Sequence, residues 1–174
     1  MITDDALNIV GSRERSVEEG RWYQGDIDVS GDVNDRNAVL YRWQRWPRGK
    51  VFYRLDDTYT QDQVANINEA FREFHLKTCI RFIPMKHNRK TFVDIRDEAG
   101  CSSHVGYDGR MHVTRLHAPG CVQRAGTVMH ELMHTLGFHH EHARADRDLY
   151  VTINWTNIVP GHEKNFDKLP RELS

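Results

Sequence analysis

A short stretch from His130 to Asp148 contains the residues whose types and spacing indicate the clearest chemistry. It begins with the pattern HExxH, formed by His130, Glu131 and His134. In a helix, residues i and i+4 lie on one face one turn apart, so both imidazoles can bind the same metal ion. Glu131 lies about 100° around the helix from His130, where its carboxylate can contact a water at the metal. The pattern therefore predicts a metal site beside a general base.

A glycine and a third histidine follow the helical pattern. Gly137 can adopt a positive φ angle, so the chain can leave the helix there and turn back. The return would bring His140 within reach of the same ion. Three neutral imidazoles leave at least one coordination position open, which is typical of a catalytic zinc site. A surface helix rich in histidine is the alternative interpretation, but the complete spacing rarely arises by chance.

The string HExxHxxGxxH is the metzincin form of the zinc motif. In this chain it extends to HELMHTLGFHHEHARADRD, in which Glu141 follows the third histidine. The extended string resembles the astacin family of zinc endopeptidases, as do YVTINWTNI, KNFD, KTCIRF and the segment from Cys101 to Cys121. The resemblance covers most of residues 37–174. It implies an α+β, metzincin-like fold with a twisted mixed sheet, two main helices and a zinc helix that borders the cleft.

The resemblance also implies a role for each residue of the motif. One Zn²⁺ per chain would be bound by His130, His134 and His140 and would polarise the scissile carbonyl. Glu131 would take a proton from the attacking water and pass it to the leaving amine. We therefore expect a zinc-dependent endopeptidase that hydrolyses extended polypeptides. The alternative is a non-catalytic zinc-binding or interaction fragment that lacks the C-terminal half of the cleft.

Four charged residues end the extended motif, and we expect them to hold the turn after the zinc helix. They are Arg144, Asp146, Arg147 and Asp148. A solvated run of charges is the usual alternative for such residues.

The composition is that of an ordinary globular protein. The 174 residues suffice for one domain with a real core, and 39% are hydrophobic and 28% charged. No apolar run approaches the length of a membrane span. The formal net charge is −1, which does not indicate nucleic acid or anionic lipid as a partner. Protein or peptide substrates are the partners that the resemblance implies.

Residues 1–36 differ from the rest of the chain in charge. They carry nine acidic and four basic side chains, for a net charge of −5, whereas residues 37–174 have a net charge of +4. The leader has little periodicity, so we expect it to be extended or irregular. We interpret residues 1–36 as a propeptide-like segment that docks on an astacin-like catalytic domain of residues 37–174. A solvated tail is the alternative.

Tyr23-Gln24-Gly25-Asp26 is similar to the FxGD motif of astacin propeptides, whose aspartate binds the zinc and displaces the catalytic water. Tyr23 stands in place of the phenylalanine. The similarity implies that Asp26 is the propeptide switch, and carboxylate oxygen is a good zinc ligand. An ordinary surface aspartate in a turn is one alternative.

A calcium loop is another interpretation of the same segment. Four residues fall at EF-hand positions one, three, five and six, namely Asp26, Asp28, Ser30 and Gly31. However, position twelve would be Asn37 instead of glutamate, and neither flank has a helical pattern.

The dipeptide Arg36-Asn37 is similar to a family activation site, because NAVL resembles the start of mature members. Arg36 would suit an activating trypsin-like protease. The resemblance implies that the freed amino group of Asn37 is buried beside Glu141, where a buried ammonium is favourable only when paired.

The three cysteines are Cys79, Cys101 and Cys121. The resemblance pairs Cys101 with Cys121, while the family counterpart of Cys79 pairs with a cysteine near the C-terminus. The family also implies a secreted, extracellular protein, although residues 1–20 contain no apolar signal-peptide region.

The family places a methionine-containing turn and a tyrosine ligand after the zinc helix. No methionine follows Met133, and the sequence ends at Ser174 soon after NFD. We therefore expect a proform that is truncated at the C-terminus, with the C-terminal subdomain largely missing.

The remaining elements follow from local patterns. We expect a helix from Thr60, its N-cap, to about Leu76, and the zinc helix over 126–136. Strands are expected over 51–56, 79–83 and 91–97, and a hairpin of 104–107 with 111–116 around Asp108-Gly109. We expect strand 111–116 to be the cleft edge, where a peptide binds as an added antiparallel strand.

Overall fold

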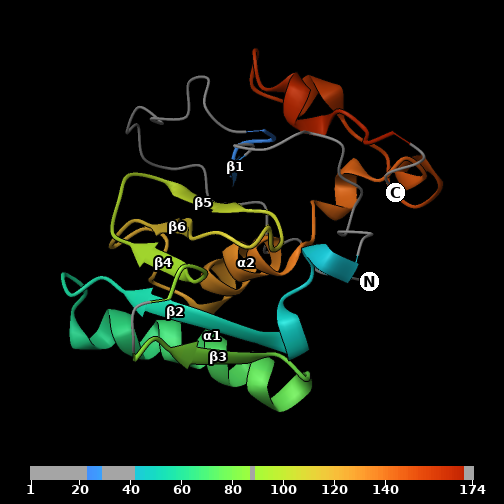
Figure 1. Cartoon of the computed structure of the whole chain (residues 1–174). Coiled ribbons are helices and arrows are strands. Elements are labelled where there is room, and N and C mark those ends of the chain that lie inside the picture. The colour runs from blue at the N-terminus through green and yellow to red at the C-terminus, as the bar shows by residue number, and fades with distance from the viewer. Residues whose placement is uncertain (1–22, 29–41, 87–88, 171–174) are drawn as a thin grey trace.

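The computed structural model describes residues 23–28, 42–86 and 89–170, in which one sheet and two α-helices dominate (Figure 1). The strands are β1 (Ile27–Asp28), β2 (Lys50–Leu55), β3 (Arg81–Pro84), β4 (Val93–Arg96), β5 (Cys101–His104) and β6 (His112–Leu116). The α-helices are α1 (Gln61–Lys77) and α2 (Ala125–Leu136). Short 3-10 helices are η1 (Arg42–Gln44), η2 (Pro47–Gly49), η3 (Glu141–Ala143), η4 (Arg147–Leu149), η5 (Trp155–Asn157) and η6 (Glu163–Phe166).

The six strands form one mixed sheet in the order β1-β5-β6-β4-β2-β3. Strands β5 and β6 pair antiparallel, and the other neighbours pair in parallel. Two main helices beside a mixed sheet confirm the α+β fold class expected from the sequence.

Helix α1 begins at the predicted N-cap, Thr60. The Thr60 hydroxyl accepts a hydrogen bond from the Gln63 backbone N–H, and the Gln63 side chain accepts one from the Thr60 N–H at 2.8 Å. This capping box satisfies two donors that a helix start would otherwise leave unpaired. The buried face of α1 consists of Ile67, Ala70, Phe71 and Phe74.

The main core lies between one face of the sheet and the two helices. Its strand residues include Val51, Val93, Ile95 and Leu116, and its helix residues include Phe71, Phe74, Val128 and Leu132. The rings of Phe71 and Phe82 stack with their centroids 4.7 Å apart. Full burial of a side chain of this size contributes about 1.5–3 kcal/mol. Burial of Val128 and Leu132 holds α2 against the sheet in the same way.

Strand β3 begins later, and strand β5 begins and ends earlier, than the sequence pattern predicts. Strand β3 starts at Arg81, because the Thr78 N–H still bonds the Phe74 carbonyl and the chain is leaving α1 at Cys79. Strand β5 covers Cys101–His104 instead of 104–107. The Gly106 N–H bonds the His134 carbonyl and the Tyr107 N–H bonds the Gln44 carbonyl, which draws these residues out of the sheet.

The prediction that strand 111–116 forms the cleft edge is wrong. Strand β6 lies inside the sheet, between β5 and β4, and its residues Thr114 and Leu116 are fully buried. Among residues 42–170, β5 is one of the two edge strands and β3 is the other, and β1 of the leader pairs with β5 in parallel. Hairpin periodicity alone could not show which of the two strands would pair with β4.

Candidate metal centre

Helix α2 and the turn after it position the three histidines of the motif. His130 and His134 project from one face of the helix, and His134 is only 2% exposed. Gly137 ends the helix with a φ of 107°, and its N–H bonds the carbonyls of His134 and Met133. This left-handed cap turns the chain back toward His140, as the sequence predicts.

The three imidazoles converge through their Nε2 atoms. The Nε2 atom of His130 lies 3.2 Å from Nε2 of His134 and 3.3 Å from Nε2 of His140. Zinc–nitrogen bonds of about 2.0–2.1 Å in a tetrahedral site place two nitrogen ligands about 3.3 Å apart. The spacing of the three nitrogens therefore fits a single zinc ion.

Asp26 provides a fourth ligand atom from the leader. Its Oδ2 lies 2.9 Å from Nε2 of His130 and 3.2 Å from Nε2 of His140. One ligand atom from each of the four residues lies within 4.8 Å of all the others. Asp26 Oδ1 is buried without a hydrogen-bond partner among the described residues. This oxygen lies 3.1 Å from Nε2 of His140, so both carboxylate oxygens face the imidazoles, which fits the N₃O ligand set of a zinc site.

Two hydrogen bonds fix the orientation of the imidazoles. His134 donates from Nδ1 to the Phe138 carbonyl at 2.7 Å, and His140 donates from Nδ1 to Gln24 Oε1 at 3.1 Å. With the proton on Nδ1, each Nε2 keeps its lone pair for a metal. The sequence analysis missed Gln24, whose only signal was its place directly before Gly25-Asp26.

Glu131, which follows His130 in α2, is only 1% exposed, and its Oε2 has no hydrogen-bond partner among the described residues. Burial, and then the negative charge of Asp26, raise the pKa of Glu131 to about 9. Burial would also raise the pKa of Asp26, but hydrogen bonds with the three histidines outweigh it and the net pKa is lowered. A cation bound between these groups would favour both carboxylates in their ionised form.

The leader reaches the cluster through a tight turn. The backbones of Tyr23 and Ile27 exchange two hydrogen bonds, and Gln24 and Gly25 between them have φ angles of 54° and 99°. A side chain at Gly25 would meet no atom closer than 3.6 Å, so lack of space does not require a glycine here. The positive φ angle does, because glycine adopts it without strain. The Ser103 N–H then bonds the Asp26 carbonyl at 3.0 Å, which seats the turn on β5.

Similarity to known proteins identifies the family of this chain. Residues 38–174 match the model of the peptidase family described as Astacin. The chain belongs to the astacin family. It is 42% identical to the zinc metalloproteinase nas-14 of Caenorhabditis elegans and 43% identical to the low choriolytic enzyme of Oryzias latipes. These matches cover 79% and 71% of this chain but only 27% and 47% of the two relatives.

A solved structure supports the same assignment. The hatching enzyme zinc-protease HCE-1 of Oryzias latipes superposes with a TM-score of 0.66 at 38% sequence identity. The match covers 74% of this chain and 64% of that chain. The α+β sheet and helices described above are therefore those of an astacin-family domain, and the chain spans less than half the length of the two curated relatives.

The remaining predicted residues belong to the activation site, its proposed partner and the calcium-loop alternative. Arg36 and Asn37 lie outside the described residues. Glu141 is exposed, and its Oε1 lies 3.2 Å from Nη1 of Arg144. Asp28 does not join Asp26 in a common site, because its Oδ2 lies 3.5 Å from Nη1 of Arg115. The other positions of the calcium-loop alternative lie outside the described residues.

The charged run after the third histidine is structural, as predicted. Arg144 donates to both carboxylate oxygens of Asp146, at 2.8 and 2.9 Å. Arg147 is buried and donates to the carbonyls of His142 and Phe166. These bonds tie the turn that carries His140 to the C-terminal segment.

The predicted disulfide between Cys101 and Cys121 is present, with the two Cα atoms 5.7 Å apart. It links the start of β5 to the segment that leads into α2. Cys79 is an exposed free thiol.

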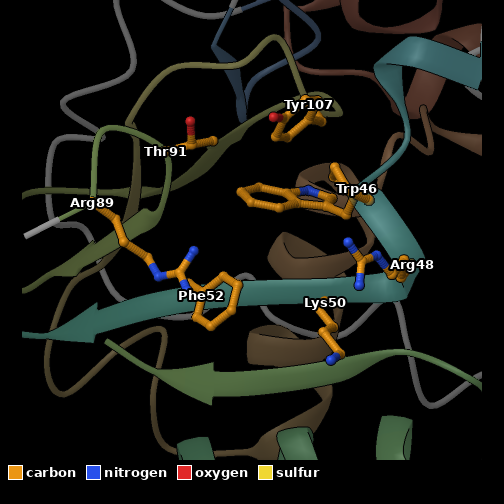
Figure 2. Close-up of a pocket in the computed structure, with 8 residues that line it drawn as sticks. Trp46, Arg48, Lys50, Phe52, Arg89, Thr91 and Tyr107 are labelled. Atoms are coloured by element: carbon orange, nitrogen blue, oxygen red, sulfur yellow. The ribbon is translucent and has the colours of Figure 1, made fainter. Parts of the chain in front are cut away.

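A cavity of about 390 Å³ elsewhere on the molecule does not have the residues for this chemistry. Figure 2 shows its aromatic and cationic lining, which includes Trp46, Arg48, Lys50, Phe52, Arg89 and Tyr107. Among the residues that the structure describes, its lining contains no carboxylate and no imidazole. The histidine cluster is therefore the better candidate for a catalytic centre.

Proposed function

We propose that this chain is the zymogen form of a zinc-dependent endopeptidase. One observation carries the proposal. His130, His134 and His140 converge at the spacing of a zinc site, with Glu131 buried beside them, in a chain of the astacin family. Residues 37–174 would be its catalytic domain and residues 1–36 its propeptide.

The three histidines would hold one Zn²⁺. When bound, zinc supplies a Lewis acid for the scissile carbonyl and lowers the pKa of water. Glu131 would accept a proton from the attacking water and return it to the leaving amine. The buried position of Glu131 suits both steps, because burial favours its protonated form and the adjacent cation favours its carboxylate form.

Extended polypeptides are the substrates that the sheet edge would accept. Strand β5 is an edge strand of residues 42–170, and the Ser103 backbone N–H donates to the Asp26 carbonyl of the leader. A substrate would take the place of β1 and pair with β5 through its backbone. Such pairing selects extended chains without fixing much of their sequence.

The leader would keep the protease latent in two ways. Asp26, whose Oδ2 lies 2.9 Å from Nε2 of His130, would take the place of the catalytic water, and β1 would keep a substrate from the edge of β5. A trypsin-like cut after Arg36 would release both contacts. The new amino group of Asn37 would then pair with Glu141, which in the uncut chain pairs with Arg144.

Secretion is the localisation that the disulfide supports. Disulfides such as Cys101–Cys121 persist in oxidising compartments and are rare in the cytosol. Among the described residues, no helix is both long and apolar enough to cross a membrane.

The decisive experiment compares Glu131→Ala with the unsubstituted protein after cleavage at Arg36. We expect cleavage of an unfolded polypeptide to fall by a factor of about 10²–10⁴ or more, since a general base typically contributes that much. Zinc content, measured by mass spectrometry, should stay at one ion in this centre. Glu69→Gln, a substitution in an exposed ion pair of α1, is the matched control and should leave cleavage unchanged.

Two results would contradict the proposal. Full activity of Glu131→Ala would show that Glu131 is not the general base. Loss of zinc from this variant would show that Glu131 is needed to maintain the metal site. If the unsubstituted protein binds zinc but cleaves nothing, the alternative of a non-catalytic zinc-binding fragment would hold.

A further inference from the structure

A second group of metal-ligating side chains lies at the connection between β5 and β6. His104 ends β5, Asp108 lies in the connection, and His112 begins β6. One ligand atom from each residue lies within 4.8 Å of the other two. The group shares no residue with the cluster around His130.

The three side chains contact one another closely. The rings of His104 and His112 stack with centroids 3.8 Å apart and planes only 5° from parallel. Nε2 of His112 lies 2.6 Å from Asp108 Oδ1, which also accepts a hydrogen bond from the Arg110 N–H at 2.8 Å. The second bond fixes the carboxylate in place, so Asp108 holds one imidazole against the other.

One atom of the group is left without a partner. Nδ1 of His104 is buried and has no hydrogen-bond partner among the described residues. A buried polar atom that makes no hydrogen bond costs about 1–3 kcal/mol. A ligand that binds imidazole nitrogen would remove this cost.

We propose that His104, Asp108 and His112 form a second metal site, which takes a divalent transition-metal ion that prefers imidazole, with Zn²⁺ as the probe. Two imidazoles and one carboxylate suit such an ion and leave a coordination position open. Parallel rings direct their nitrogen lone pairs in parallel, so one ring must rotate about its Cβ–Cγ bond. That torsion has broad minima in histidine.

The ion would lie at the edge of the sheet that the leader uses. His104 pairs in register with Asp28 of β1, and the Asp28 charge acts on both imidazoles. An anionic residue faces this end of β5 in the proform. The site therefore belongs to the same strand that the proposed substrate would use, but it is built from different residues than the histidine cluster.

The test counts zinc ions per chain in the full protein, by native mass spectrometry at a buffered free zinc concentration. His104→Gln and His112→Gln should each bind one ion fewer than the unsubstituted chain, whatever the other centre holds. His117→Gln is the matched control. Its Nδ1 lies 3.0 Å from Asp97 Oδ1, which reproduces a histidine–aspartate pair without a second imidazole. This control should bind as many ions as the unsubstituted chain.

An unchanged ion count in both His104→Gln and His112→Gln would overturn the proposal, and so would the loss of one ion in His117→Gln. If circular dichroism shows that either glutamine variant does not fold, the Asp108→Asn variant tests the site instead. Asp108 lies in an exposed connection, so this substitution should leave the fold intact. We expect this variant to raise the zinc dissociation constant of the second site at least tenfold. An unchanged constant would contradict a role for Asp108 as a ligand.

Discussion

His140 donates its Nδ1 hydrogen bond to Gln24 Oε1 across 3.1 Å, although the two residues are 116 positions apart in the chain. The Gln24 side chain also donates from Nε2 to the Asp167 carbonyl at 3.1 Å. One glutamine thus joins the leader, the third histidine of the cluster and the C-terminal segment. Because it accepts the Nδ1 proton, it leaves Nε2 of His140 free to bind a metal.

Gln24→Leu should therefore weaken zinc binding by the uncut chain, by about tenfold or more, as loss of a partner behind a ligand typically does. Gln24→Glu keeps an acceptor for His140 and should largely preserve the affinity. The measurement is competition with a coloured chelator of known zinc affinity. Equal affinity of Gln24→Leu and the unsubstituted chain would show that the hydrogen bond does not orient His140.

Asp26→Ala should weaken latency, because the carboxylate lies 2.9 Å from His130 Nε2, where it would exclude water from the metal. We expect uncut protein with this substitution to cleave a peptide substrate measurably faster than the unsubstituted uncut protein. Asp28→Ala is a matched control, since it keeps the backbone of β1 on β5 and the Asp28 carboxylate contacts Arg115 instead of His130, His134 or His140. Unchanged latency in Asp26→Ala, or the same gain in cleavage rate in Asp28→Ala, would show that Asp26 is an ordinary surface residue.

The local parts of the fold and the site could be predicted from the sequence. The capping box at Thr60 and the left-handed Gly137 involve residues within a few positions of one another. The convergence of His130, His134 and His140 follows from one helical turn and one reversal. Such features depend on backbone geometry that a short segment determines by itself.

The long-range parts could not be predicted in the same way. The sequence pattern identified two strands near residues 101–116 but could not tell which of them would pair with β4. Sheet order depends on contacts between distant segments, and the pairing of β6 with both β5 and β4 identifies it as the interior strand. The bond between Gln24 and His140 was missed for the same reason.

Thr135→Val tests a buried hydroxyl cluster behind the zinc helix. The Thr135 hydroxyl lies 2.8 Å from Ser103 Oγ and 3.2 Å from Thr114 Oγ1, so it links α2 to β5 and β6. Valine keeps the shape and removes the hydroxyl, and Ser103 and Thr114 keep their bond to each other at 3.0 Å. We expect the free energy of unfolding to fall by about 1–2 kcal/mol, measured by urea denaturation.

Thr58→Val is the control for that loss, because the Thr58 hydroxyl is exposed and bonds the local Asp56 side chain. A similar loss in both variants would mean that the buried position of Thr135 adds nothing. An unchanged stability of Thr135→Val would show that the hydroxyl cluster does not hold the helix to the sheet.

Asp94 on β4 should make stability depend on pH. Its carboxylate is 2% exposed and accepts hydrogen bonds from Arg54 at 2.6 and 2.7 Å and from Arg96 at 2.7 Å. Burial would raise the pKa of Asp94, but these two guanidinium groups outweigh it, and the net pKa is lowered. A lowered pKa in the folded state contributes stability above the unfolded pKa of about 4. That contribution is lost as the pH falls through the folded value.

Asp94→Asn should therefore reduce the free energy of unfolding at pH 7 by about 1–3 kcal/mol. The difference from the unsubstituted protein should shrink as the pH falls below about 4, because the native carboxyl is then protonated and its charge-assisted bonds are lost. Urea denaturation at pH 7, 5 and 3 measures the difference, with Asp57→Asn as an exposed control. A difference that stays constant over this range would mean that the charge of Asp94 adds nothing to its hydrogen bonds.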